Sequence, residues 1–281
     1  MKVEEIMQTE FVHSTVPGTR ATVLQLMAKH GTNTIPLLKK GSKELAGMVT
    51  RADLMSKAEE EQLALLMRRD PPTVSPSDEV EDAARIFLEQ GLRKIPVVDG
   101  KRRLKGMITI HQIIRKVVST QYPNELISPF VKRQIVCIWE NTPLRATYAV
   151  MRLAGADMLP VLSKEGDLVG VISVGDIMNL GEIVNERRLS SMSAAGEGTD
   201  WSWDATAVLH IATKELQLPD KIVSEVMIRG PITTFEKATI GEVVKSMRRH
   251  NINQMVVTTA KGEVCGIIRD ADLLRIFQKA D

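Results

Sequence analysis

The chain has few cysteines and no long apolar run, and these absences limit what it can be. Only Cys137 and Cys265 occur among 281 residues, and no C-x-x-C is present, which argues against a disulfide framework or a zinc finger. No apolar stretch approaches the ~18 residues of a membrane span, and the opening MKVEEIMQTEF lacks the apolar segment of a secretory signal. We therefore expect a soluble, cytoplasmic protein that does not contact a membrane.

Aromatic residues and excess charge are also scarce. Aromatics make up 4% of the chain and the net charge is +2, whereas a nucleic-acid face needs clustered cations and aromatics. The basic run KRRLK at 101–105 is expected to be a solvated turn. Neither H-E-x-x-H, G-x-S-x-G nor a Walker motif appears, and the five histidines are scattered. We expect no catalytic residue and no metal site.

What the sequence does contain is one phrase repeated four times. A proline or valine in a short apolar run recurs at steps of 60, 64 and 96 residues, and a glycine after it recurs at steps of 59, 64 and 96. The first set is Pro36, Pro96, Pro160 and Val256, and the second is Gly47, Gly106, Gly170 and Gly266. Two landmarks with nearly the same spacing indicate duplication.

Each copy is predicted to be a β-α-β-β-α unit, which makes the fold class α+β. A short β run precedes a helix with apolar residues at helical spacing, then come two apolar strands joined by a turn, and then a second helix. A unit of about 60 residues buries little surface alone, so the copies should pair. The predicted copies are residues 1–60, 65–120, 124–182 and 221–281.

A hydroxyl and a carboxylate stand three residues apart at the strand-to-helix junction of two copies. These are Thr50 with Asp53 and Ser173 with Asp176. The pattern suits a capping box, in which the two side chains satisfy the first helical amides. It also suits a nucleotide, because a carboxylate can accept hydrogen bonds from both ribose hydroxyls. Copy two has Gln112 in place of the acid and copy four has Arg269 in place of the hydroxyl, so we expect these two sites to be impaired.

The repeated phrase, from small residue through apolar-Pro-Val to Gly-x-x-Thr/Ser-x-x-Asp, resembles the CBS domain, named for cystathionine β-synthase. Four copies in one chain resemble the γ subunit of the AMP-activated protein kinase and its prokaryotic relatives. The resemblance implies two intramolecular pairs of repeats, stacked as a pseudo-twofold disk, with nucleotide in the clefts between paired repeats.

The resemblance also implies which residues would line two clefts. The first would contain Thr50, Asp53, Pro71, Pro72, Leu92, Arg93 and Lys94, with the two basic residues on phosphate. The second would contain Ser173, Asp176, Pro231, Ile232, Ile252 and Asn253. Because it lacks cations, the second cleft should take fewer phosphates or S-adenosylmethionine. The cleft of Asp272 should be empty, and Arg269 would either pair with an acid or contact a neighbour's phosphate.

The leading hypothesis is a non-catalytic, energy-sensing regulatory module that binds AMP, ADP or ATP without a metal. Its partner would be an unidentified regulated protein, and disks could form a homodimer. An S-adenosylmethionine-binding regulator is the first alternative. A scaffold or nucleic-acid-associated protein with vestigial clefts is the second, and an enzyme is a weaker third.

An insertion at 183–220 separates the third and fourth copies. Its centre, SSMSAAGEGTD, is rich in small residues and predicts a flexible loop. Trp201 and Trp203 follow, two apart, as on one side of an extended segment. They would either pin the linker to the disk or form a partner-binding lid.

Overall fold

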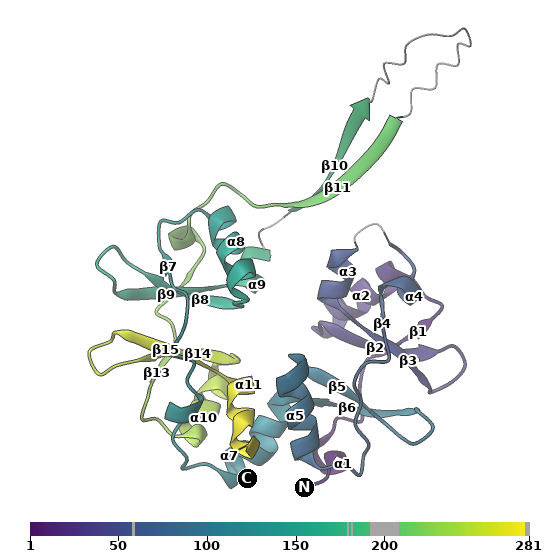
Figure 1. Ribbon diagram of the computed structural model, residues 1–281, viewed down its shortest axis with the longest axis horizontal. Helices are drawn as coiled ribbons and strands as arrows, with labels where there is room; N and C mark the ends of the chain where they lie inside the picture. The colour runs from purple at the N-terminus through teal and green to yellow at the C-terminus, as the bar shows by residue number, and fades with distance from the viewer. Residues whose placement is uncertain (58–59, 179, 181, 192–207, 279–281) are drawn as a thin grey trace, which may run out of the picture. The chain divides into compact units, whose positions relative to one another are not determined.

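The computed structural model describes residues 1–57, 60–178, 180, 182–191 and 208–278, and it confirms an α+β chain of four similar repeats (Figure 1). The chain divides into two compact units. Unit 1 is Met1–Ile135 with Ile232–Asp281, and unit 2 is Val136–Pro231. Unit 1 therefore holds repeats 1 and 2 and most of repeat 4, and unit 2 holds most of repeat 3 and the first residues of repeat 4. The stacking of two pairs into a disk stays a prediction.

Each repeat consists of a first helix, an antiparallel strand pair and a second helix, as the sequence predicts. Repeat 1 has α2 (Arg20–His30), β2 (Thr34–Lys39), β3 (Leu45–Thr50) and α3 (Arg51–Ser56). Repeat 2 has α5 (Val80–Gln90), β5 (Lys94–Val98), β6 (Leu104–Thr109) and α6 (Ile110–Ile113), which continues through the π-helical turn η1 (Ile114–Val118) into α7 (Ser119–Gln121). Repeat 3 has α8 (Leu144–Ala154), β8 (Met158–Leu162), β9 (Leu168–Ser173) and α9 (Val174–Met178). Repeat 4 has α10 (Ile240–His250), β14 (Gln254–Thr258), β15 (Val264–Arg269), α11 (Asp270–Leu273) and the 3-10 turn η4 (Leu274–Gln278).

The short β run before each first helix lies parallel to the first strand of the pair. It forms β1 (Ser14–Val16), β7 (Ile138–Trp139) and β13 (Thr233–Phe235) in repeats 1, 3 and 4. In repeat 2 it is reduced to a single bridge between Val74 and Val97. The first helices all end at a residue in the left-handed conformation. These residues are Gly31, Gly91, Gly155 and Asn251, and glycine and asparagine tolerate that conformation best.

The recurrent glycine marks the point where another segment crosses the second strand of the pair. A Cβ on Gly47 would lie 2.7 Å from the carbonyl oxygen of Arg68, in β4 (Arg68–Arg69), which pairs with β3. A Cβ on Gly106 would lie 2.8 Å from the oxygen of Gln8. Contacts this short to backbone exclude any side chain, and this is the physical reason for the spacing seen in the sequence.

The crossing is reciprocal in repeats 1 and 2. The segment leading into repeat 2 lies on the sheet of repeat 1, and the segment leading into repeat 1 lies on that of repeat 2. The other two glycines are crossed likewise. Gly170 faces Ile228 of β12 (Ile228–Arg229), inside unit 2, and Gly266 faces Lys132, inside unit 1.

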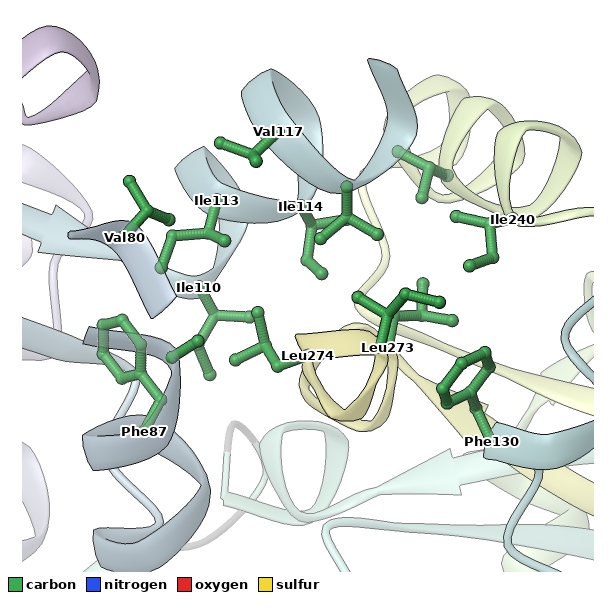
Figure 2. Close-up of a cluster of buried hydrophobic side chains, with 14 of the residues drawn as sticks. Val80, Phe87, Ile110, Ile113, Ile114, Val117, Phe130, Ile240, Leu273 and Leu274 are labelled. Carbon is green, nitrogen blue, oxygen red and sulfur yellow. The ribbon is translucent and has the colours of Figure 1, made fainter. Parts of the chain in front are cut away.

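The core of unit 1 is shared by repeats 2 and 4 (Figure 2). Leu273 and Leu274, at the junction of α11 and η4, pack among side chains of α5 and α6, and all are almost inaccessible to solvent. The helices of repeat 1 enclose a smaller cluster of their own, and those of repeat 3 do the same in unit 2.

The insertion contains two strands that the sequence did not lead us to expect. β10 (Glu182–Ser191) and β11 (Val208–Gln217) pair antiparallel, from Glu182 opposite Gln217 to Ser191 opposite Val208. The predicted loop and both tryptophans, Trp201 and Trp203, lie outside the described residues.

Candidate functional site

The Thr50–Asp53 pair forms a complete capping box at the start of α3. The Thr50 hydroxyl donates to Asp53 Oδ2 at 2.7 Å, the Thr50 amide donates to the same oxygen at 2.8 Å, and the Asp53 amide donates to Thr50 Oγ1 at 3.2 Å. The capping interpretation of this motif is therefore correct. It does not exclude the ligand interpretation, because a helix N-terminus with a partly exposed carboxylate remains an attractive place for ribose and phosphate.

The box of repeat 3 has the same geometry. Asp176 Oδ2 accepts from the Ser173 hydroxyl at 2.6 Å and from the Ser173 amide at 2.8 Å. Its Oδ1 has no hydrogen-bond partner among the described residues. One acceptor of a charged group is therefore left to meet a ligand.

The box of repeat 2 offers a different atom. Gln112 Oε1 accepts from the Thr109 amide at 2.8 Å and the Thr109 hydroxyl at 3.0 Å, so the amide oxygen caps the helix as a carboxylate would. What remains of the side chain is an NH₂ group, which can only donate. A ribose hydroxyl pair would find no anion here.

In repeat 4 the carboxylate is fully engaged by its own repeat. Arg269 Nε donates to Asp272 Oδ2 at 2.9 Å and Arg269 Nη2 donates to Oδ1 at 2.7 Å, while the Asp272 side chain is 9% exposed. Of the two roles predicted for Arg269, the structure has the pairing with an acid. A ligand would have to break a bidentate ion pair to reach this carboxylate.

Lys94 joins repeat 2 to the end of the repeat 1 hairpin. Its Nζ donates to Thr32 Oγ1 at 2.7 Å, and Thr32 lies two residues before Thr34, which is the β-sheet partner of Thr50. The structure thus brings this cation towards the junction from which α3 starts. Burial removes water from the Lys94 ammonium and thereby lowers its pKa. An anion that took the place of this water would be held strongly.

Arg93 contacts a group that the sequence did not lead us to consider. Its Nη1 and Nη2 donate to Asp270 Oδ1 and Oδ2 at 3.2 and 2.6 Å, 177 residues along the chain. The side chain of Asp270 is 7% exposed and also accepts from the amide of Ala271. Arg93 was expected to contact phosphate beside Asp53, but its ion pair links repeat 2 to repeat 4. An internal signal existed, since the residue equivalent to Asp270 is arginine, isoleucine or valine in the other three repeats.

The other residues predicted for the first cleft follow β4 or precede β5. Pro71 is buried and Pro72 half-buried, directly after β4, which pairs with the strand that ends at Thr50. Leu92 packs against the core of unit 1. Their common cleft with Asp53 stays a prediction.

The residues predicted for the second cleft belong to different units. Ser173, Asp176 and Pro231 lie in unit 2, and Ile232, Ile252 and Asn253 lie in unit 1. Their meeting in one cleft stays a prediction too.

The basic run at 101–105 is held by acids of the same chain. Asp99 accepts from the backbone amides of Lys101 and Arg103, both at 3.0 Å, and from Arg103 Nε at 2.9 Å. Arg102 forms an ion pair with Asp70 at 3.1 Å. These pairings give the run a structural role in the turn between β5 and β6.

We expect Asp99→Asn to weaken the dependence of stability on acid pH. The backbone N–H of Arg103, together with the other donors, lowers the pKa of Asp99 to about 2 from its ordinary 3.8. Because the folded pKa is the lower one, the stabilisation is present above the ordinary value and is lost as pH falls towards about 2. Melting temperatures measured between pH 5 and pH 2 should fall more steeply for the parent than for the variant. Parallel curves would contradict this role.

Two classes of site have no counterpart in the described part of the chain. No cluster of three histidine, cysteine, aspartate or glutamate side chains there could hold a metal ion. Among the described helices, none combines the length and apolar character needed to cross a bilayer.

Comparison with known proteins identifies the repeats. A family model described as the CBS domain matches residues 3–60, 62–119, 127–182 and 223–279. The uncharacterized protein MJ1225 of Methanocaldococcus jannaschii is 22% identical over 299 residues, covering 99% of both chains. Its crystal structure, described as that of a candidate archaeal homolog of g-AMPK, has a TM-score of 0.72 at 20% identity and covers 99% of this chain and 100% of that one.

A second solved structure is similar over the same length. It is that of an uncharacterized conserved protein from Pyrococcus horikoshii, with a TM-score of 0.71, 27% identity, and coverage of 99% of this chain and 100% of that one. The four-repeat fold is therefore shared along the entire chain.

Proposed function

Because the chain belongs to the CBS domain family through all four of its repeats, we propose that it is a non-catalytic regulatory module that binds adenine nucleotides. One observation carries the proposal. The same capping position retains hydroxyl and carboxylate in repeats 1 and 3, but presents an amide donor in repeat 2 and a closed ion pair in repeat 4. A helix cap does not need a carboxylate, since Gln112 caps its helix equally well. Binding of both ribose hydroxyls does need one.

At the first site, Asp53 would accept the ribose hydroxyls and Lys94 would meet the phosphates. The half-buried position of Lys94 strengthens its attraction for an anion, since less water screens the charge. Pro71, Pro72 and Leu92 would provide apolar walls for the base. Arg93 can join only if it leaves Asp270, so phosphate would compete with an acid of repeat 4.

At the second site, Ser173 and Asp176 would hold the ribose in the same manner. Asn253 stands where the first site has a cation, so this site should prefer a ligand with fewer phosphates, or S-adenosylmethionine. Ligand type would then differ between the two sites of one chain.

We propose an energy-sensing role in the cytoplasm, with AMP, ADP or ATP as regulatory ligand and no metal required. The likeness to a candidate homolog of g-AMPK is the reason for proposing energy sensing. Ligand would favour one arrangement of repeats, and a regulated partner protein would bind that arrangement. The effect on the partner cannot exceed the difference in ligand affinity between the two arrangements.

We expect Asp53→Ala and Asp176→Ala each to remove one binding event in calorimetric titrations with AMP, ADP, ATP and S-adenosylmethionine. Hydrogen bonds to a charged group contribute about 1.5–3 kcal/mol, so each loss corresponds to about 10- to 150-fold in affinity. Gln112→Ala is the matched control, because it removes the same cap without removing a carboxylate. It should cost similar stability and leave binding unchanged.

The proposal fails if both aspartate variants bind like the parent while losing as much stability as Gln112→Ala. The boxes would then be caps and nothing more. Gln112→Asp tests the converse, since it restores the missing charge in repeat 2 and should add a binding event.

A further inference from the structure

A groove with a volume of about 310 Å³ lies in unit 1, between the helical segment α6–η1–α7 of repeat 2 and α10 of repeat 4. His111 and Arg115 line one side, and Lys245 and Arg248 line the other. Asp270 lies among its lining residues. None of the residues that we assign to the first cleft lines the groove.

The four basic residues converge because of helical spacing. His111 and Arg115 are four residues apart, and Lys245 and Arg248 are three apart, so each pair lies on one helix face. Like charges such as those of Lys245 and Arg248, three residues apart, destabilise a helix by a few tenths of a kcal/mol. Together with Arg115 on the facing helical segment, they create a concentrated positive field.

None of these four side chains has an ion pair or a side-chain hydrogen bond among the described residues. The acid in the groove does not neutralise them, because both oxygens of Asp270 are bound by Arg93 and one also accepts from the Ala271 amide. Elsewhere in unit 1, Arg102, Arg103 and Arg133 all pair with acids. Here the basic side chains line a concave site whose one acid, Asp270, is already paired with Arg93.

The floor of the groove is apolar. Val244 and Met247 of α10 line it, together with Ile114, which belongs to the shared core of Figure 2. The volume is at the small end of ligand pockets, roughly 300–1,000 Å³, which favours a small molecule over a peptide. Cations around an apolar floor suit a ligand with several negative charges and a less polar part.

We propose that this groove binds a small molecule carrying at least two phosphate groups, held by Arg115 and His111 from repeat 2 and by Lys245 and Arg248 from repeat 4. Bound there, it would bridge the two repeats and add to the packing between them. The four basic residues of the site are not cleft residues, and Ile252 is the one groove-lining residue that is also assigned to the second cleft, so each proposal can be right without the other.

Inorganic pyrophosphate and triphosphate are the probes, added to the full chain in calorimetric and thermal-unfolding titrations. The parent should bind one equivalent and melt at a higher temperature. The double variant Arg115→Ala/Lys245→Ala should lose at least tenfold in affinity, whereas Arg115→Lys, which keeps the charge, should retain most of it. Raising the salt concentration should weaken binding to the parent.

Two control variants distinguish binding in the groove from binding to surface charge or to the clefts. Arg249→Ala/Lys237→Ala removes two cations of repeat 4 that do not line the groove, and it should bind the probes like the parent. Lys94→Ala removes the cation that the first cleft would offer to phosphate and that does not line the groove, and it should also bind the probes like the parent. Melting without ligand will show that the variants are folded.

The inference is overturned if neither probe binds the parent at millimolar concentration, or if the groove variant and the Arg249→Ala/Lys237→Ala control bind equally well. It is also overturned if the cleft variant, and not the groove variant, loses the probe. AMP titrations of the groove variant should still show the cleft events, which keeps a failure here distinct from a failure of the proposed function.

Discussion

Replacing Leu273 by alanine should lower the free energy of unfolding by about 2–5 kcal/mol, the range for large-to-small changes in a well-packed core. Leu273 is 0% exposed and comes from repeat 4, yet it packs in a cluster that includes Val80, Phe87 and Ile113 of repeat 2. The cavity would open where two repeats share one core, so collapse around it should be limited. Urea unfolding followed by circular dichroism measures the change.

Leu153→Ala is the control for this prediction, because Leu153 is 82% exposed. A surface change of this kind should stay within about 0.5 kcal/mol of the parent. If Leu273→Ala costs no more than the control, repeats 2 and 4 do not share a core in solution.

Replacing Gly106 by alanine should lower the free energy of unfolding by about 1–3 kcal/mol or more, the usual cost of overpacking. The added Cβ would lie 2.8 Å from the carbonyl oxygen of Gln8 and 3.0 Å from Met7 Sδ. The Gln8 amide donates to the Met107 carbonyl oxygen at 2.8 Å, and the Met107 amide donates to the Gln8 carbonyl oxygen at 2.9 Å. The Gln8 oxygen therefore cannot move away from position 106 without breaking these hydrogen bonds. Thermal and urea unfolding measure the loss.

Gly100→Ala is the matched control in the same repeat. Nothing lies within 4 Å of its added Cβ, so its effect should be near zero or slightly stabilising, through loss of freedom in the unfolded chain. Equal effects of the two alanines would mean that the crossing at Gly106 is not formed.

The repeat architecture could be predicted because it depends on local signals that recur. The proline and glycine steps and the Thr/Ser-x-x-Asp box each report short-range sterics or hydrogen bonding. The capping geometry at Thr50 followed from the sequence for the same reason. Whether a ligand binds at that box did not follow from the sequence, because capping and ribose binding use the same two side chains.

Features that depend on distant residues were missed. The pairing of Arg93 with Asp270 joins positions 177 residues apart, and no periodicity records it. The crossing segments β4 and β12 have only two residues each, too few for an alternating pattern. The strands β10 and β11 stabilise one another across the insertion, so neither is distinctive alone.

The exchange of crossing segments determines how this chain can be divided for expression. In the sheet of each repeat, the second strand of the pair is shielded by residues that sequence-based boundaries assign to a neighbouring repeat, as with Gln8 beside Met107 and Lys132 beside Ile267. A fragment cut at such a boundary would expose an unprotected β edge, the usual starting point for aggregation. Soluble fragments of this protein should therefore begin upstream of the crossing segments and keep both partners of each exchange.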